Sequence, residues 1–431
     1  MTHVAIIGNG IAGISAARRL RELEPDWSIT VVSGESTHHY SRPALMYIFM
    51  GHMRYAETKP YEDQDWARWK INLVRDWVVD IDTDASQLKL HQGAPLSYDH
   101  LIIATGSKPN FFGWPGQDLP GVQGLYSLMD LHQLYENTQH ARHATVVGGG
   151  LIGIELGEML HSRGVHVTFL VREDSYWSNV LPPAESAMVN RLILDAGFEL
   201  RLKTELKEIV AGPHGRVGSI TTTNGDTIET QLVGLTAGVS PNLDLVRETS
   251  IGFGRGVLVN DQLRTNVENV YAIGDCAEIE RPGDERNLLQ QVWYTGKMQG
   301  MHVAEVMTGQ TDAPYDPGIW YNSAKFFDLE YQTYGLVLPR PPAHHVQHWY
   351  EDERGGRGLR LVSDANTGAF LGANLMGMRG RHRQFESWIR DARSLEYVLD
   401  HLHVADFDPE FTRRFLKQVR TMTPVTAGGA S

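Results

Sequence analysis

The sequence predicts an α/β protein with two three-layer domains, each built on a parallel sheet, followed by a smaller α+β domain. The first observation is a pattern of strand, glycine turn, helix and strand that occurs twice, about 140 residues apart. The second is a change of texture near residue 314, after which aromatic-rich strands precede helices. A chain of 431 residues is also too long for one ordinary core, which favours several domains.

The first copy of the pattern begins at the N-terminus. Apolar, β-branched residues predict strands over 3–7 and 29–32, and helical periodicity predicts a helix over 14–23 between them. The first strand and the helix are joined by three glycines with the spacing G-x-G-x-x-G, namely Gly8, Gly10 and Gly13. The second copy has strands over 145–147 and 165–171, a helix over 154–160, and the glycines Gly148, Gly150 and Gly153.

Glycines at this spacing suit a dinucleotide pyrophosphate. The first makes the tight turn, the second lets the backbone approach the phosphates, and the third lets the helix pack on the strand. The helix N-terminus then presents free N–H groups to the anion. One such turn is weak evidence, but two turns in the same context predict two bound dinucleotides. Ala12, inside the first turn, is a further candidate contact.

An acidic residue follows the first turn at the position where the adenosine ribose is held. Glu35 lies 22 residues after Gly13, at the end of the second strand, and its carboxylate is predicted to accept hydrogen bonds from the ribose hydroxyls. The alternative is a solvated acid in a loop.

The second copy departs from this pattern. Its second strand ends in Val171-Arg172, so an apolar residue and a cation stand where the acid is expected. Arginine beside the ribose suits a 2′-phosphate, so the sequence leans toward NADPH. In the alternative, Arg172 is simply exposed, and Glu173 or Asp174 serves NADH.

Further motifs follow in a fixed order: Tyr40-Ser41-Arg42-Pro43, Ala104-Thr105-Gly106 and Ile273-Gly274-Asp275. With these motifs, residues 3 to 312 resemble the pyridine nucleotide–disulfide oxidoreductase superfamily. The nearest resemblance is to the branch with rubredoxin, putidaredoxin and ferredoxin reductases and the flavin part of NADH-dependent nitrite reductase. The resemblance implies two Rossmann-like, glutathione-reductase-like domains that bind FAD and NAD(P)H.

The resemblance also implies roles for individual residues. Arg42 and Pro43 would touch the adenosine and pyrophosphate of FAD, and the backbone of Val78 would meet the adenine. Asp275 beside Gly274 would accept hydrogen bonds from the ribitol. Ala104, Thr105, Gly106 and Gly238 would lie at the two crossings between the dinucleotide domains, and the helix start within 290–300 would face the flavin.

Glu155 follows the third glycine of the second turn by two residues. In relatives a glutamate at this place lies near the nicotinamide and pairs with a lysine. That lysine is replaced here by Met46-Tyr47, so we expect a nicotinamide contact without the pair. An acid favoured by the positive end of its helix is the alternative.

The cysteine count separates this chain from the disulfide reductases. Its single cysteine, Cys276, cannot form a redox pair and is predicted to be a packed small residue. The resemblance implies that hydride passes from the nicotinamide to FAD, and without a cysteine relay we expect electrons to leave for the acceptor from the flavin itself. The expected acceptor is a small acidic iron–sulfur carrier. A flavin oxidase or small-molecule reductase, and a redox-responsive FAD/NAD(P)-binding subunit of a larger complex, stay open.

The net charge and the hydropathy of the chain exclude some classes of binding partner. A net charge of −13 argues against nucleic acid, and no apolar run reaches the ~20 residues of a membrane helix. The N-terminal sequence and the single cysteine predict a cytoplasmic protein.

An acidic carrier would need a local basic patch, which Arg379, Arg381 and Arg383 are expected to supply. His344, His345 and His348 lack a carboxylate pattern, so no metal site is expected. The resemblance leaves a homodimer open.

The expected domains follow from these motifs. They are an FAD-binding domain in two segments (1–112 and 241–312), an inserted NAD(P)-binding domain (113–240), a C-terminal α+β domain (313–422) and a flexible tail (423–431). Helices are expected over 285–309, 385–402 and 409–419.

Overall fold

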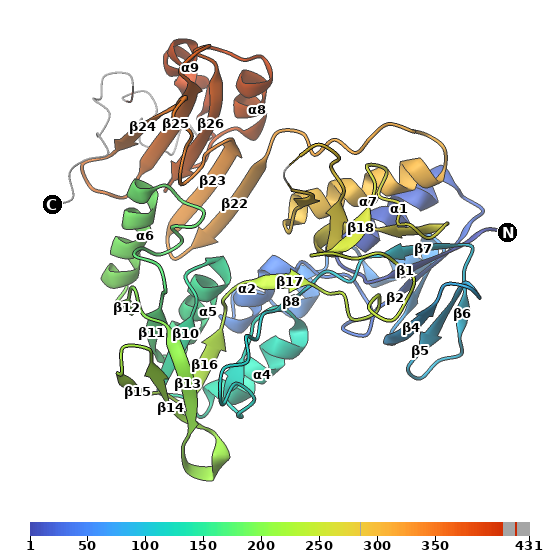
Figure 1. Ribbon diagram of the computed structural model, residues 1–431, viewed down its shortest axis with the longest axis horizontal. Coiled ribbons are helices and arrows are strands. Elements are labelled where there is room, and N and C mark those ends of the chain that lie inside the picture. Colours follow the sequence, from blue (N-terminus) through green and yellow to red (C-terminus); the bar gives the residue numbers. More distant parts are fainter. Residues whose placement is uncertain (285, 408–418, 420–431) are drawn as a thin grey trace. The chain divides into compact units, whose positions relative to one another are not determined.

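The computed structural model describes residues 1–284, 286–407 and 419 (Figure 1). The chain divides into two compact units. The first unit contains Met1–Phe111, Gln123–Gln139 and Gly238–Pro317, and the second contains Phe112–Val122, His140–Ala237 and Gly318–Ser431. Residues 123–139, expected in the inserted domain, thus pack in the first unit. The expected separation of a nicotinamide domain (113–240) from a C-terminal domain (313–422) stays a prediction.

A five-stranded parallel sheet forms the centre of the first unit. Its order is β19 (Val270–Ala272), β7 (His100–Ile103), β1 (His3–Ile7), β2 (Ser28–Val32) and β3 (Ile71–Val74). Strands covered on both faces need apolar residues throughout, and four of the five residues of β1 are buried. The strands predicted from the first copy of the motif are confirmed.

Two helices of the first unit lie side by side, α1 (Ile11–Leu23) and α7 (Trp293–Met307) (Figure 1). Gly300 permits their close approach, because a Cβ there would lie 2.4 Å from the carbonyl oxygen of Ala12. The helix expected over 285–309 begins later than predicted. Leu288–Leu289 instead form strand β21, which pairs with β20 (Ala277–Ile279).

Smaller elements complete the first unit. An antiparallel sheet contains β4 (Val78–Asp82), β5 (Gln87–Leu90) and β6 (Leu96–Ser97). Strand β18 (Val257–Val259) pairs with β20, and β8 (Ser107–Pro109) pairs with β17 (Val239–Pro241). The short helices are α2 (Leu45–Phe49), α3 (Asp63–Arg68) and α4 (Leu128–Thr138).

The second unit contains the other copy of the motif. Its sheet has the order β12 (Glu199–Arg201), β11 (His166–Leu170), β10 (His143–Val147), β16 (Leu232–Leu235) and β9 (Val122–Gln123). Helix α5 (Leu151–His161) follows the glycine turn, and α6 (Pro183–Asp195) precedes β12. A small antiparallel sheet contains β13 (Leu206–Ala211), β14 (Val217–Thr222) and β15 (Thr227–Glu229).

The C-terminal part of the second unit is a five-stranded antiparallel sheet. Its order is β22 (Tyr321–Phe326), β23 (Leu329–Gly335), β26 (Phe370–Met376), β25 (Gly358–Asp364) and β24 (His345–Glu351). Helices α8 (His382–Arg390) and α9 (Leu395–His401) contact β26 and β25 (Figure 1). The single helix expected over 385–402 is wrong, because the chain turns at Ala392 with a φ of 47°. Most of the predicted 409–419 helix and all of the 423–431 tail lie outside the described residues.

A buried ion pair fastens α6 to the C-terminal sheet. Glu185 on α6 is fully buried and accepts hydrogen bonds from Arg360 on β25 at 2.6 and 2.5 Å, and from the amide of Asn374 at 3.1 Å. The Arg360 guanidinium also donates to Gln347 and lies over the ring of Trp349. The hydrogen bonds offset part of the free-energy cost of burying these two charges.

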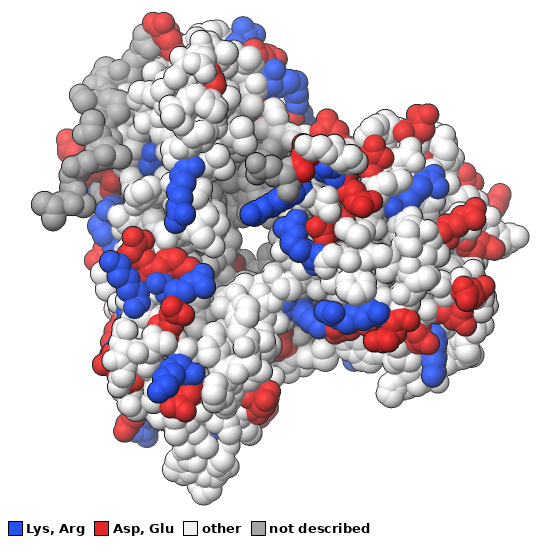
Figure 2. Space-filling model, viewed as in Figure 1, with Lys and Arg blue, Asp and Glu red and all other residues white. Residues whose placement is uncertain are grey.

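Acidic and basic side chains are mixed on the surface. In Figure 2 basic side chains are scattered among acidic ones on the face shown. Among the described helices, none combines the length and the hydropathy that a membrane crossing requires.

Candidate functional site

The first glycine turn is shaped by backbone contacts that exclude side chains. Gly8 has a φ of 108°, and a Cβ there would lie 2.2 Å from the carbonyl oxygen of Ala104. A Cβ on Gly13 would lie 2.1 Å from the carbonyl oxygen of Gly8. At Gly10, by contrast, a Cβ would point into open space, and no side chain caps α1 there. The free N–H groups of α1 thus border room for a pyrophosphate, which fits a dinucleotide.

The second turn repeats this arrangement in the second unit. Gly148 has a φ of 129°, and a Cβ there would lie 2.5 Å from the carbonyl oxygen of Thr236. Gly153 is closed in by Tyr176, Thr236 and the turn itself, whereas Gly150 again borders open space. No side chain caps α5 at Gly150. Both predicted turns therefore have the geometry expected of dinucleotide sites.

Glu35 lies at the carboxyl end of β2, where the sequence placed it. Its carboxylate accepts hydrogen bonds from the backbone of Leu128 at 2.9 Å, from the Arg42 guanidinium at 2.9 and 3.3 Å, and from the Tyr40 hydroxyl. Burial alone would raise the pKa of Glu35, but the Arg42 cation and the hydrogen bonds from Arg42, Tyr40 and the backbone of Leu128 together lower it. An ionised carboxylate is the form that accepts hydrogen bonds from ribose hydroxyls.

Arg42 connects this acid to a residue that the sequence analysis missed. Its guanidinium lies over the ring of Tyr126, 4.5 Å from the centroid, and donates to the Tyr126 carbonyl. Arg42 and Pro43 belong to a short 3-10 helix that starts two residues after Tyr40. The structure therefore brings the Tyr-x-Arg-Pro motif and Glu35 together in the first unit.

Asp275 is the second predicted acid of the first unit. It follows Gly274, whose φ of 74° favours glycine, at the end of β19. Its carboxylate accepts hydrogen bonds from the hydroxyls of Ser107 and Tyr126, both at 3.3 Å. Burial raises the pKa of Asp275, and the two hydroxyls oppose this shift. Gln291, before α7, donates to the Ser107 hydroxyl at 2.7 Å.

The other predicted residues of the first unit occupy less informative places. Val78 is buried at the start of β4. Thr105 of the predicted hinge donates to the carbonyl of Asn242 at 2.9 Å, and Gly106 has a φ of 68°. Gly238 has a φ of 94° and accepts a backbone hydrogen bond from Asn110.

Several side chains near the first turn carried no sequence signal. Asn9 donates to Ser36 and accepts a hydrogen bond from His39, whose burial lowers its pKa to about 4. The half-exposed ring of Trp77 packs over Gly34, where a Cβ would lie 2.1 Å from the indole. These contacts join segments distant in sequence, so only the fold reveals them.

Arg172 is exposed at the end of β11, with 71% of its side chain accessible, and pairs with Glu173 at 2.9 Å. Val171, at the predicted acid position, is fully buried. The Arg172 guanidinium is therefore accessible to a ligand phosphate, but the Glu173 carboxylate would compete with that phosphate for it.

Glu155 lies in the first half of α5, close to the second glycine turn. Burial, with a further contribution from Glu158, raises its pKa to about 7. A carboxyl group with this pKa changes charge near neutral pH. Tyr176 beside it donates to the carbonyl of Gly150 at 2.9 Å.

Cys276 is fully buried, and its thiol lies within hydrogen-bonding distance of the carbonyl oxygens of Ile103 and Ile273 and interacts with Thr105. Burial raises its pKa, which disfavours the reactive thiolate.

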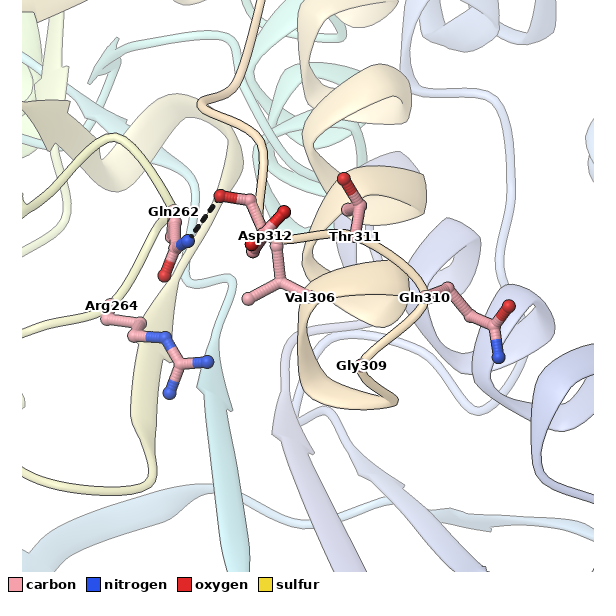
Figure 3. Close-up of a pocket in the computed structure, with 7 residues that line it drawn as sticks. All are labelled: Gln262, Arg264, Val306, Gly309, Gln310, Thr311 and Asp312. Carbon is pink, nitrogen blue, oxygen red and sulfur yellow. Dashed lines mark hydrogen bonds between the residues drawn. The ribbon is translucent and has the colours of Figure 1, made fainter.

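A surface cavity of the first unit lies apart from these residues. It is lined by Gln262, Arg264, Val306, Gly309, Gln310, Thr311 and Asp312 (Figure 3). None of the predicted cofactor contacts lines it, so this cavity is not the predicted dinucleotide site.

Comparison with known proteins decides the family. The family model described as pyridine nucleotide-disulphide oxidoreductase matches residues 2–307. The chain belongs to this family. It is an FAD-dependent NAD(P)H oxidoreductase, as the sequence predicted, although its single cysteine leaves it without the disulfide of the family name.

Individual relatives agree with this assignment. Rhodocoxin reductase of Rhodococcus erythropolis is 31% identical over 78% of this chain and 78% of its own length. Rubredoxin-NAD(+) reductase of Acinetobacter baylyi is 28% identical over 74% of this chain and 81% of its own length. Putidaredoxin reductase, solved as a covalent complex with putidaredoxin, has a TM-score of 0.81 at 20% identity and covers 97% of this chain and 98% of that chain. The predicted fold class is confirmed.

Proposed function

We propose that this oxidoreductase takes hydride from NADPH and passes electrons from FAD to a small acidic electron carrier. The observation that carries the proposal is the pair of uncapped glycine turns, each bordering open space at its second glycine. When bound, FAD supplies hydride acceptance and onward electron transfer. The protein's own residues bind the cofactors, orient them and tune their charge.

The first unit would hold FAD through groups of matched chemistry. Glu35 offers a carboxylate to the adenosine ribose, Arg42 a cation to the pyrophosphate, and Asp275 an acceptor to the ribitol. These side chains belong to one hydrogen-bonded set in one compact unit, which supports a single cofactor lying along them.

The preference for NADPH rests on Val171 and Arg172. A buried valine cannot accept hydrogen bonds from ribose hydroxyls, whereas an exposed guanidinium can bind a 2′-phosphate with paired hydrogen bonds. The Acinetobacter relative is named for NAD(+), so this preference would set the chain apart from it.

Arg172→Ala should lower kcat/KM for NADPH by about ten- to hundredfold, because one charge-assisted contact to phosphate is worth ~1.5–3 kcal/mol. The value for NADH should change little. Anaerobic stopped-flow reduction of the flavin with both nucleotides measures this. A strong NADH preference that Arg172→Ala leaves untouched contradicts the assignment.

Glu173→Gln distinguishes binding of NADPH through Arg172 from binding of NADH through Glu173. If Arg172 binds the 2′-phosphate, removing the Glu173 carboxylate frees the Arg172 cation. The kcat/KM for NADPH should then be higher than in the wild type. If Glu173 instead holds the ribose of NADH, the same change lowers kcat/KM for NADH.

We also propose that Arg381 and Arg383 contribute to carrier docking. The expected group of three free guanidinium groups needs revision, because Arg379 forms two hydrogen bonds of 2.5 Å with Glu330 and lies over the ring of Phe407. Arg381 and Arg383 are exposed. A local patch of this kind can steer an acidic partner toward a chain of net charge −13.

Replacing Arg381 and Arg383 together with glutamine should slow electron delivery to an acidic ferredoxin or rubredoxin at low salt and flatten its salt dependence. Flavin reduction by NADPH should stay normal. Arg379→Gln is the matched control, because its ion pair with Glu330 is expected to affect stability and not docking. Identical salt profiles for the wild type and the double variant, with each carrier tested, would refute this surface.

A further inference from the structure

Tyr126 connects two parts of the predicted FAD site that are far apart in sequence. Its ring supports Arg42, and its hydroxyl lies 3.3 Å from the Asp275 carboxylate. It stands just before α4, whose N-cap is Ser127. Because residues 123–139 pack in the first unit, both contacts lie within one compact body.

The hydrogen-bond donors and acceptors fix the direction of this network. The backbone N–H of Ser107 donates to the Tyr126 hydroxyl oxygen at 2.9 Å. An amide can only donate and an ionised carboxylate can only accept, so the phenolic proton is directed to Asp275. Burial raises the pKa of Tyr126 to about 12, which keeps this proton in place at neutral pH.

A close approach holds the hydroxyl at this position. A Cβ on Gly106 would lie 3.0 Å from the Tyr126 hydroxyl oxygen, so only glycine leaves the phenol its full room. On the other side of the residue, the Tyr126 carbonyl accepts a hydrogen bond from Arg42. The ring and the carbonyl of Tyr126 therefore both contact Arg42, whereas its hydroxyl contacts Asp275.

We propose that Tyr126 is a positioning residue for FAD, whose hydroxyl orients the Asp275 carboxylate and whose ring orients the Arg42 guanidinium. The inference rests on the proposed placement of FAD along Glu35, Arg42 and Asp275. One side chain would then couple the group that receives the ribitol to the cation that receives the pyrophosphate. Neither contact requires Tyr126 to touch the flavin.

The test compares FAD with ADP, which lacks the ribitol and the flavin. Apoprotein is titrated calorimetrically with each ligand. Tyr126→Phe keeps the ring but loses the hydroxyl, so FAD affinity should fall about tenfold while ADP affinity stays unchanged. Tyr126→Leu also loses the ring under Arg42, so ADP affinity should fall as well, about threefold.

A pH profile gives a second readout that general destabilisation does not mimic. The Tyr126 hydroxyl opposes the upward pKa shift of Asp275, so Tyr126→Phe should raise that pKa further. Relative to the wild type, the acid limb of the FAD affinity profile should then lie at higher pH in Tyr126→Phe and in Tyr126→Leu.

Tyr98→Phe is the matched control. Tyr98 is a buried tyrosine of the same unit whose hydroxyl has no hydrogen-bond partner among the described residues, so its removal should leave FAD affinity and the pH profile unchanged. Wild-type FAD affinity and an unshifted profile in Tyr126→Phe would overturn the role of the hydroxyl. Failure of the wild-type apoprotein to bind FAD would instead overturn the proposed function.

Discussion

Replacing Asp275 with alanine should yield a protein that is purified without FAD. The carboxylate is held by two hydroxyl donors beside Gly274, and its remaining lone pairs are the proposed acceptors for the ribitol. Each lost hydrogen bond to a charged group costs ~1.5–3 kcal/mol, so FAD affinity should fall by at least about hundredfold. The ratio of flavin to protein absorbance and a titration of the apoprotein measure the loss.

Cys276→Ser is the neighbouring control for this experiment. The thiol is fully buried beside the carbonyl oxygens of Ile103 and Ile273, and serine is close to cysteine in size, so the variant should retain FAD and its rate of reduction by NADPH. If Cys276→Ser abolished reduction while FAD stayed bound, a thiol would take part in the reaction after all.

The second large effect is expected at the contact between α6 and the C-terminal sheet. Glu185→Ala leaves the Arg360 guanidinium buried without its partner, which should lower the free energy of unfolding by about 3–5 kcal/mol. Denaturant unfolding monitored by circular dichroism measures this loss. Because Glu185 is far from the first glycine turn in sequence and lies in the other unit, FAD content should be unchanged.

Two further variants make the result specific. Glu185→Leu combined with Arg360→Met removes both charges and should recover most of the lost stability, because an apolar pair of similar volume needs no solvation. Arg191 lies on the same helix as Glu185, and Arg191→Ala removes its exposed ion pair with Glu351 of β24. This change should alter the free energy of unfolding by less than about 1 kcal/mol. Equal losses in Arg191→Ala and Glu185→Ala would refute the importance of burial.

Local periodicity was sufficient to predict the two dinucleotide folds. Each βαβ unit is a short stretch in which apolar strands, glycine spacing and helical periodicity occur together, so each is recognisable without tertiary contacts. Glu35 was found for the same reason, since its distance from Gly13 is set by the length of one helix and one strand. Its use as a ribose contact stays a prediction.

Long-range contacts were beyond the reach of the sequence. Tyr126 lies 84 residues from Arg42 and 149 from Asp275, and no local pattern marks it. Glu330 lies 49 residues before Arg379, so the basic cluster looked freer than it is. The late start of α7 has a similar cause, because Leu288 and Leu289 pair with a strand in place of continuing a helix.

The buried pair of Glu185 and Arg360 also sets an order of events during synthesis. The ribosome adds 175 residues between these two partners, which takes roughly 10 to 35 seconds at common translation speeds. During that interval α6 has an acid on the face that later becomes buried, so it stays hydrated and undocked. A chain that stops before Arg360 should therefore leave α6 undocked, because the buried cation that Glu185 needs as a partner is missing.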